Sequence, residues 1–434
     1  MSFPRVLIVR LSTWIAFLTW LISLILALIT GRDLLYNTFY FITLVLLGSW
    51  LWARQNLRGL QIKRRLRTPR SQVGRFIEES FEVINQSWLS KLWVEIRDES
   101  NLPGHHASRV LVSLGRKRPM IWTVKTPGLR RGRYRLGPIT LYSGDPLGIF
   151  ALKKTIPQSH HVLVYPATFE IPGFRLPPGY LPGGKVTHYR THYLTTNVAT
   201  VRDYVPGDSY NRIHWRSTAR TGRLMVKEFE LDPTSDIWIL LDLDADVHFS
   251  QPWEEPDLTN LPAVLRQRPL AKNPTLIPST LEYAASAAAS IAERYLAERR
   301  AVGLIAYTPN REVLQLDRGY RQFTKILEML AIVEPISSLA FAHVLLAERH
   351  YLNRTTTVVA VTPSVNPAWV NVLRDYRHSG INVTVVLIAA STFGPAPSYR
   401  PLLAELWASQ IPTYVVHNGA SITTALSHLA LPTD

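Results

Sequence analysis

The run LSTWIAFLTWLISLILALIT, residues 11–30, contains no charged side chain, and neither does the run LLYNTFYFITLVLLGSWLWA, residues 34–53. A helix needs about 20 apolar residues to cross a bilayer core about 30 Å thick, so each run can span a membrane once. Only Gly31, Arg32 and Asp33 separate the runs, which predicts a tight helical hairpin. A cleaved signal peptide has a shorter apolar core and no second span behind it. The alternative is a pair of helices buried in a soluble core.

The basic residues are concentrated next to these runs. Residues 1–70 hold ten Lys or Arg and one Asp, a net charge of +9, whereas the whole chain carries +16. Those that follow the second run form a juxtamembrane collar suited to anionic lipid headgroups: Arg54, Arg58, Lys63, Arg64, Arg65, Arg67 and Arg70. Because Lys and Arg gather at the cytoplasmic ends of spans, we expect a two-pass plasma-membrane protein with both termini in the cytoplasm. The lipid bilayer is therefore an expected partner.

The composition excludes several classes of protein. A net charge of +16 suggests nucleic-acid binding when taken alone. However, the residues after position 70 carry only +7, so we expect no nucleic-acid partner. The chain contains no cysteine, which excludes disulfides, thiol nucleophiles, Cys-based zinc sites and Cys-ligated iron–sulfur clusters.

Short alternating runs, separated by Gly, Pro, Asn and Asp, characterise residues 71–165. Six of them are predicted strands: Phe81–Ile84, Lys91–Ile96, Arg109–Leu114, Met120–Val124, Arg133–Leu136 and His161–Tyr165. This spacing predicts an immunoglobulin-like β-sandwich, in which no catalytic grouping stands out. Residues 166–233 are expected to form a linker and a motif segment. Residues 179–185 of the linker look like the start of a phosphate-binding loop, but Val186 replaces the Ser or Thr that would hold magnesium.

The densest group of polar and aromatic residues is VRDYVPGDSYNRIHWRSTARTGRLMVKEFE, residues 201–230. The expected elements are a strand, a turn, a helix N-capped by Asp208, and a second strand: residues 198–204, Pro206-Gly207, residues 209–220 and residues 224–230. Gly222 should end the helix, because glycine reaches the left-handed C-cap conformation without steric cost.

This stretch closely resembles the signature of the family catalogued as domain of unknown function 58. The matching residues are Arg202, Tyr204, Pro206, Gly207, Asp208, Ile213, His214, Trp215, Ala219, Arg220 and Gly222. Residues 131–134 and 145–150 are also similar to this family, as is the order of two spans, a strand-rich module, the motif and an α/β domain. The resemblance implies an association with AAA+ ATPases of the MoxR type and with other von Willebrand A proteins. The resemblance implies an order of domains, but little about a reaction, because the family's activity is itself unassigned.

Two interpretations of the motif are open. In the first, Asp208, His214 and Arg220 form a polar site in which His214 titrates near neutral pH and Arg220 binds an anionic group. In the second, Asp208 caps the helix, Trp215 packs in a core, and the arginines pair with Asp203 or Asp208. We favour the second, structural or partner-docking interpretation, because no set of nucleophile, base and orienting group is visible.

Residues 234–434 alternate between apolar strands and helices, which is typical of a doubly wound, mainly parallel sheet. Together with the motif, this pattern is similar to a von Willebrand A domain. Residues 247–279 interrupt it with an insertion that contains six prolines. The insertion lies at the carboxyl edge of the predicted sheet, where α/β domains bind ligands, so it is expected to be a lid, a partner-binding loop or a disordered decoration.

Asp242, Asp244 and Asp246 follow the first strand of this domain, where von Willebrand A domains often bind a divalent cation. Three carboxylates can hold Mg²⁺ or another hard cation through oxygen. The site is degenerate, however: both serines of the Asp-x-Ser-x-Ser pattern of such domains are replaced here, and residues 362–364, Thr-Pro-Ser, stand where an Asp would be expected. Residues 337–338, both Ser, stand near where the Thr of that pattern would be expected. The alternative is that these carboxylates only end a strand and cap a loop.

The sequence thus predicts three parts: a transmembrane helical hairpin in residues 1–70, an immunoglobulin-like β-sandwich, and a doubly wound, von Willebrand A-like α/β domain. We expect a membrane-anchored scaffold or adaptor without catalytic activity. It would dock a partner such as a MoxR-type AAA+ ATPase or an assembly client. The alternative function is a metal-dependent hydrolase that uses the cluster of Asp242, Asp244 and Asp246 together with His214.

Overall fold

The structure is a computed structural model and has two compact units. It describes the following residues: 5–8, 11–176, 198–205, 210, 213–229, 236–254 and 274–430. Unit 1 comprises residues 1–169, 249–290 and 324–334, and unit 2 comprises the remainder. Several predicted features lie outside the described residues: Pro206, Gly207 and Asp208 of the motif, the phosphate-loop-like stretch, and residues 255–273 of the insertion.

The N-terminal helical hairpin of unit 1 consists of α1 (Leu11–Thr30) and α2 (Asp33–Asn56). Both helices are long and apolar enough to cross a membrane, as predicted. Trp20 of α1 joins them: its Nε1 donates to Thr43 Oγ1 at 2.8 Å, and its ring lies 5.5 Å from that of Phe39 between centroids. Their large apolar side chains face outward instead; Ile29, for example, is 75 % exposed. This exposure argues against the alternative of two helices buried in a soluble core.

The hairpin is joined to the strands that follow by buried hydrogen bonds. Lys91 is fully buried, and its Nζ donates to the Gln55 carbonyl at 2.6 Å in the last turn of α2. Asn56, also fully buried, donates to Ser143 Oγ at 2.9 Å and to the Gly144 carbonyl at 3.0 Å. The same Gln55 carbonyl also accepts from the Arg58 amide at 3.1 Å, so Lys91 adds a second partner at the C-terminus of α2.

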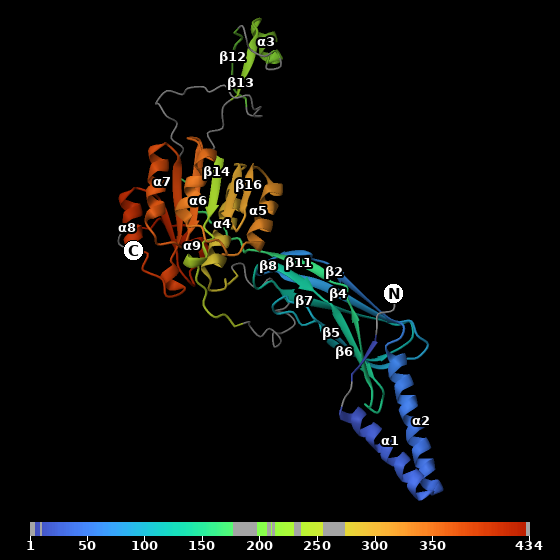
Figure 1. Ribbon diagram of the computed structural model, residues 1–434. Coiled ribbons are helices and arrows are strands. Elements are labelled where there is room, and N and C mark those ends of the chain that lie inside the picture. The colour runs from blue at the N-terminus through green and yellow to red at the C-terminus, as the bar shows by residue number, and fades with distance from the viewer. Residues whose placement is uncertain are drawn as a thin grey trace. The chain divides into compact units, whose positions relative to one another are not determined.

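The strand-rich part of unit 1 is a β-sandwich (Figure 1). Its strands are β1 (Arg5–Ile8), β2 (Leu60–Leu66), β3 (Arg70–Gln72), β4 (Phe76–Asn85), β5 (Lys91–Asp98), β6 (Arg109–Leu114), β7 (Pro119–Pro127), β8 (Gly132–Leu136), β9 (Ile139–Gly144), β10 (Ala151–Ile156) and β11 (His160–Tyr165). They form sheets in the orders β1-β10-β9-β5-β6, β2-β4-β7 and β3-β11-β8. The first two sheets share one core, in which the rings of Phe81 of β4 and Trp122 of β7 stack on each other at 5.0 Å between centroids. Val94 and Ile96 of β5 belong to the same core.

Strand β2 changes one expectation about the basic collar. It begins at Leu60, so Lys63, Arg64 and Arg65 belong to a sheet. Strand alternation places Arg64 on the same face as Leu60, and the Arg64 side chain is only 1 % exposed. The assignment of Arg64 to a lipid-binding collar is therefore wrong.

Unit 2 contains a six-stranded sheet in the order β16-β15-β14-β17-β18-β19. Its strands are β14 (Asp236–Leu241), β15 (Val302–Tyr307), β16 (Arg311–Asp317), β17 (Thr356–Thr362), β18 (Asn382–Ile388) and β19 (Thr413–Val416). The helices that lie between and after these strands in sequence are α4 (Thr280–Ala297), α5 (Tyr320–Ile332), α6 (Phe341–Glu348), α7 (Ala368–His378), α8 (Arg400–Ala408) and α9 (Ile422–Ala425). The first part of α4 and most of α5 belong to unit 1. All neighbouring strands pair in parallel except β16, which is antiparallel to β15. This pairing agrees with the α/β pattern of the sequence.

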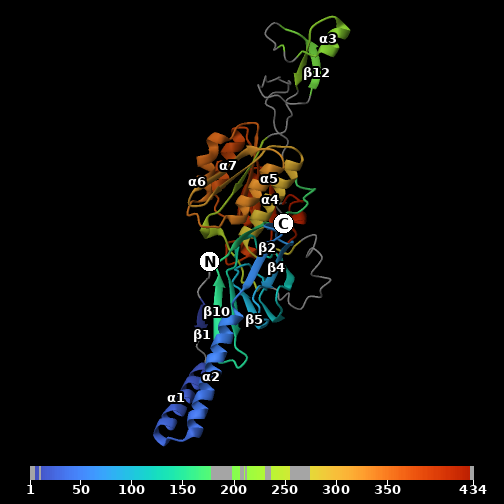
Figure 2. The ribbon, with the colours of Figure 1, turned by 90° about the vertical axis from the view of Figure 1, so that its right-hand side faces the viewer.

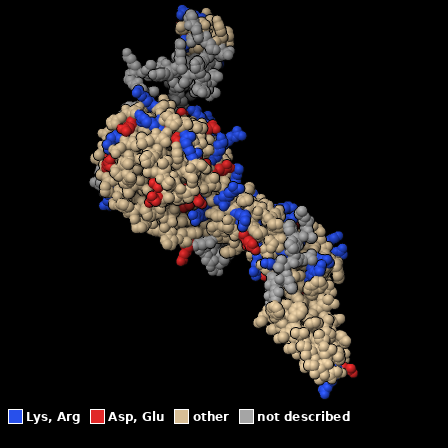
Figure 3. All heavy atoms as spheres, in the orientation of Figure 1, with Lys and Arg blue, Asp and Glu red and all other residues tan. Residues whose placement is uncertain are grey.

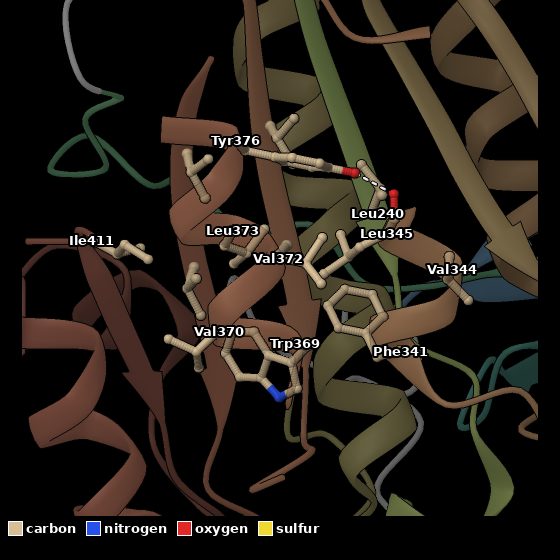
Figure 4. Close-up of a cluster of buried hydrophobic side chains, with 14 of the residues drawn as sticks. Leu240, Phe341, Val344, Leu345, Trp369, Val370, Val372, Leu373, Tyr376 and Ile411 are labelled. Atoms are coloured by element: carbon tan, nitrogen blue, oxygen red, sulfur yellow. Dashed lines mark hydrogen bonds between the residues drawn. The ribbon is translucent and has the colours of Figure 1, made fainter. Parts of the chain in front are cut away.

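Helices α6, α7 and α8 cover one face of this sheet and bury a continuous apolar cluster (Figure 4). The central strands β14, β17 and β18 are buried on both faces, which explains why they read as unbroken apolar runs. Trp369 of α7 is 1 % exposed and meets the ring of Phe341 edge-on at 6.1 Å between centroids. The hydroxyl of the fully buried Tyr376 donates to the Leu345 carbonyl, which joins α7 to α6.

Candidate functional site

The motif forms a small element of its own, built from two strands and a short helix. Strand β12 (Val198–Asp203) pairs antiparallel with β13 (Met225–Phe229), and α3 (Trp215–Thr221) lies between them in sequence (Figure 2). Ile213 makes a bridge to Val226, and both side chains are buried. The predicted order of strand, helix and strand is thus present, with Ile213 as its packing residue.

Helix α3 begins later than the sequence indicates. Its N-cap is His214, whose Nδ1 accepts from the Ser217 amide at 3.3 Å and lies 2.7 Å from Ser217 Oγ. The predicted cap, Asp208, lies outside the described residues, and the predicted helix start is six residues too early. The helix ends as expected: Gly222 has a φ of 67°, and its amide donates to the Thr218 carbonyl.

The surface of this element is unusually rich in exposed aromatic and apolar side chains. Trp215 is 67 % exposed and Tyr210 is 72 % exposed, and Val205 and Leu224 are also exposed. Helix α3 has no buried side chain at all, so the expectation that Trp215 packs in a core is wrong. The ring of Tyr210 stacks on Tyr204 at 6.0 Å between centroids, which holds it in place. Tyr210, Val205 and Leu224 were not predicted, because exposure is a tertiary property.

The remaining motif residues are distributed around this surface. Arg202 is partly buried, and its Nη1 donates to the Asp203 carbonyl at 3.0 Å. Asp203, Ala219 and Arg220 are exposed. The polar site of Asp208, His214 and Arg220 and the pairing of the arginines with Asp208 both involve a residue outside the described ones, and they stay predictions.

A second polar cluster lies at the carboxyl end of β14. Asp242 is 1 % exposed and accepts from Thr362 Oγ1 at 2.5 Å and from the Asp244 amide at 3.1 Å. Burial raises the pKa of Asp242 to about 7, although the hydrogen bonds from Thr362 and Asp244 act in the opposite direction. The loop after β14 is fixed by the Ala245 amide, which donates to the Ser337 carbonyl at 2.9 Å. The structure therefore brings Asp242, Thr362 and Ser337 to one edge of the sheet.

The three-carboxylate metal site is not formed by this arrangement. Oδ1 of Asp244 accepts from the Asp246 amide at 3.2 Å, so this carboxylate caps its own loop as in the structural alternative. The Asp246 side chain is exposed. Among the residues that the structure describes, no group of three or more His, Asp or Glu side chains converges as metal ligands do. The donor set does not fit the predicted site for Mg²⁺ or another divalent cation.

A buried charged cluster that the sequence pattern did not reveal lies inside the β-sandwich. Arg64 donates to Glu79 at 2.7 Å and to Asp98 at 3.0 Å, and His105 Nε2 lies 2.8 Å from Asp98 and 3.0 Å from Glu79. All four side chains are at most 2 % exposed. The cluster could have been found from the alternation of inward and outward side chains along a strand, because Arg64 and Glu79 both occupy inward positions.

This cluster predicts a specific pH dependence of stability. Burial lowers the pKa of His105, but its hydrogen bonds to Asp98 and Glu79 outweigh burial and raise the pKa above 6.5. Burial raises the pKa of Asp98, but hydrogen bonds from His105 and Ser100 and the charge of Arg64 bring it below 3.8. The His105 contribution is therefore complete below pH 6.5 and is lost as the pH rises through the folded pKa. The Asp98 contribution is complete above pH 3.8 and is lost on acidification.

We therefore expect hydrogen-exchange protection of β4 and β5 to be greatest between about pH 4 and pH 6.5 and to decline above that range. His105→Gln should remove the decline on the alkaline side. The neighbouring His106 is exposed, so His106→Gln is the matched control and should keep the wild-type profile. An unchanged profile in His105→Gln would show that another group titrates.

The comparisons with known proteins concern this same motif. A family model described as "Protein of unknown function DUF58" matches residues 200–261. This segment matches the DUF58 family. The match starts within β12 and includes α3 and β13, in agreement with the resemblance drawn from the motif. The "Uncharacterized protein YeaD" of Bacillus subtilis (strain 168) is 22 % identical over 326 residues, which is 72 % of this chain and 74 % of the relative.

Two solved structures are similar to parts of the chain. A CARDB domain from Pyrococcus furiosus matches 24 % of this chain and 91 % of that domain, with 17 % identity and a TM-score of 0.18. A β-glucosidase from Listeria innocua matches 24 % of this chain and 16 % of the enzyme, with 9 % identity and a TM-score of 0.17. Structural similarity as weak as this does not indicate a function.

Proposed function

We propose that this chain is a membrane-anchored docking protein that binds a protein partner through the surface of β12, α3 and β13. The observation that carries the proposal is the exposure of Trp215, 67 %, within the segment that matches the family model. Contiguous exposed apolar patches mark interaction sites, and Trp, Tyr and Arg side chains supply much of the binding energy of protein interfaces. Trp215 is followed by the exposed Arg216, and the exposed Arg220 lies about one turn after Arg216.

The partner class comes from the family resemblance. We infer an AAA+ ATPase of the MoxR type, another von Willebrand A protein or an assembly client as the bound protein. In this proposal the hairpin spans the plasma membrane with both termini in the cytoplasm, which is supported by the net charge of +9 on residues 1–70. The β-sandwich, of immunoglobulin-like kind, serves as a spacer. The parallel sheet of unit 2 serves as a doubly wound, von Willebrand A-like scaffold.

The proposal is tested with the full-length chain in lipid nanodiscs, titrated with a purified MoxR-type ATPase from the same organism. We expect saturable binding, and Trp215→Ala should raise Kd by about 30-fold or more, the effect of losing an interface anchor worth about 2 kcal/mol. Arg220→Ala should weaken binding in the same direction.

The matched control is Trp407→Ala, because Trp407 is also an exposed tryptophan, 56 % exposed on α8. It should leave Kd unchanged. Equal affinity of wild type, Trp215→Ala and Arg220→Ala would contradict the proposal. Metal-dependent hydrolytic turnover by the purified chain, lost in Asp242→Asn, would instead support the enzyme alternative.

A further inference from the structure

The end of the β-sandwich that meets the helical hairpin carries a surface that protein docking does not use. Three loops lie at this end: residues 86–90 between β4 and β5, residues 115–118 between β6 and β7, and residues 145–150 between β9 and β10. The first loop is joined to the end of α2, because Lys91 donates to the Gln55 carbonyl at 2.6 Å. Both ribbon views show α2 reaching the strands of unit 1 at this end (Figures 1 and 2).

Two of the loops are held together by one buried side chain, that of Asn85, which is fully buried. Its Nδ2 donates to the Leu89 carbonyl at 2.9 Å and to the Leu114 carbonyl at 3.1 Å. Its Oδ1 accepts from the Ser87 amide at 3.0 Å, and its own carbonyl accepts from the Lys117 amide at 2.8 Å. The two loops therefore form one rigid surface.

The exposed side chains of this surface are aromatic and basic. Trp88 is 73 % exposed. The exposed cations of the loops and of the end of α2 are Arg54, Arg58, Arg116, Lys117 and Arg118. Asp145 is the single acidic residue in these stretches; it is 2 % exposed and accepts from the Phe150 amide at 2.6 Å. The charge presented outward is thus entirely positive.

The helices place this surface at the level of the membrane interface. Arg54 lies over the ring of Trp50 at 5.2 Å in the last turns of α2, and Trp14 is exposed in the first turn of α1. Tryptophan favours the headgroup level of a bilayer, so these residues mark where the span ends. Figure 3 shows the hairpin surface free of charge between its tip and the β-sandwich, where Lys and Arg begin to gather.

We propose that this surface lies on the membrane, with Trp88 in the headgroup region and Arg116, Lys117 and Arg118 bound to the phosphates of anionic phospholipids. The cations attract the negative surface of the leaflet, and the amphipathic indole ring is stable at its boundary. The lipid contacts of the juxtamembrane region thus come from loops of the β-sandwich as well as from α2. This inference rests on the membrane anchoring of the proposed function and is independent of its protein partner.

The absence of cysteine from the chain makes the test direct, because one introduced cysteine can be spin-labelled alone. Trp88→Cys is labelled and reconstituted in vesicles of 70 % phosphatidylcholine and 30 % phosphatidylglycerol. Its accessibility to oxygen relative to a water-soluble nickel complex is then compared with two reference sites. Leu21→Cys lies in the middle of α1 and should report bilayer depth, and Trp407→Cys on α8 should report water.

We expect the label at position 88 to give an accessibility ratio between those of the two reference sites. A ratio equal to that at position 407, with position 21 in the bilayer, would overturn the inference and leave the anchoring intact. Water-like values at both positions 21 and 88 would overturn the anchoring as well.

The lipid preference is tested separately by native mass spectrometry of detergent-released protein. The variant Arg116→Gln/Lys117→Gln/Arg118→Gln should retain about tenfold less phosphatidylglycerol than wild type, because three attractive charges are lost. The matched variant Arg318→Gln/Arg321→Gln/Arg354→Gln removes three exposed charges from unit 2 and should retain as much as wild type. If both variants lost the same amount of phosphatidylglycerol, the loss would depend only on the net charge of the chain, and the assigned site would be overturned.

Discussion

Replacing Arg64 by methionine should lower the free energy of unfolding of the β-sandwich by about 3–5 kcal/mol, the cost of leaving buried charges without their partner. Arg64 neutralises Glu79 and Asp98 at 2.7 Å and 3.0 Å, in a place where all three side chains are 1 % exposed. Methionine fills a similar volume, so the loss reports the charge rather than a cavity. Denaturant unfolding of the full chain in micelles, followed by hydrogen exchange of β2 and β4, measures it.

The neighbouring arginine provides the control for this experiment. Arg65 lies on the same strand, is 71 % exposed and pairs with Glu82 at 3.6 Å. An exposed pair of this kind contributes at most about 1 kcal/mol, so Arg65→Met should have a small effect. Similar losses in both variants would show that the buried cluster has no special role. Glu79→Gln combined with Arg64→Met should recover part of the stability, because fewer charges then stay unpaired.

The fold was predictable from the sequence for segments whose hydrophobic pattern matches one regular element. Strand β6 has the bounds that the sequence predicts, and the two hairpin helices coincide closely with the charge-free runs. Strand β9 was not predictable because it lies between β10 and β5, is buried almost throughout, and so shows no alternation. Strand β10 contains the adjacent Lys153 and Lys154, which break the apolar pattern in the same way.

The segment that matches the family model was predictable from its motif, whereas the geometry of that segment was not. The motif lies in the segment that the family model matches. Helix α3 starts only at Trp215, after Ile213 has made a bridge to Val226 that the helical pattern does not reveal. Trp215 illustrates the same limit: a tryptophan in a helix pattern reads as core, and only the tertiary structure shows which face is covered. The carboxylates of Asp242 and Asp244 are neighbours in sequence, yet each is engaged by a different backbone amide.

Replacing Trp369 by alanine should lower the free energy of unfolding of the parallel sheet and its helices by about 3–5 kcal/mol, because a large cavity opens where α7 packs. Trp369 is 1 % exposed and contacts Phe341 of α6, so both helices should lose protection from hydrogen exchange (Figure 4). Trp407→Ala on α8 removes a side chain of the same size that is 56 % exposed, and it should change stability by about 0.5 kcal/mol or less.

The position of Trp369 also makes this variant a probe of the polar edge of the sheet. Helix α7 starts just after the loop in which the Ser364 amide donates to Thr362 Oγ1 at 2.9 Å, and Thr362 in turn donates to Asp242. If α7 fixes that loop, Trp369→Ala should raise hydrogen exchange at the amides of Ser364 and Asp244 together. The docking surface around Trp215 is built from other strands, and partner affinity should therefore persist in any Trp369→Ala protein that stays folded. A parallel loss of partner binding in that folded variant would mean that the sheet edge, and not α3 alone, contributes to docking.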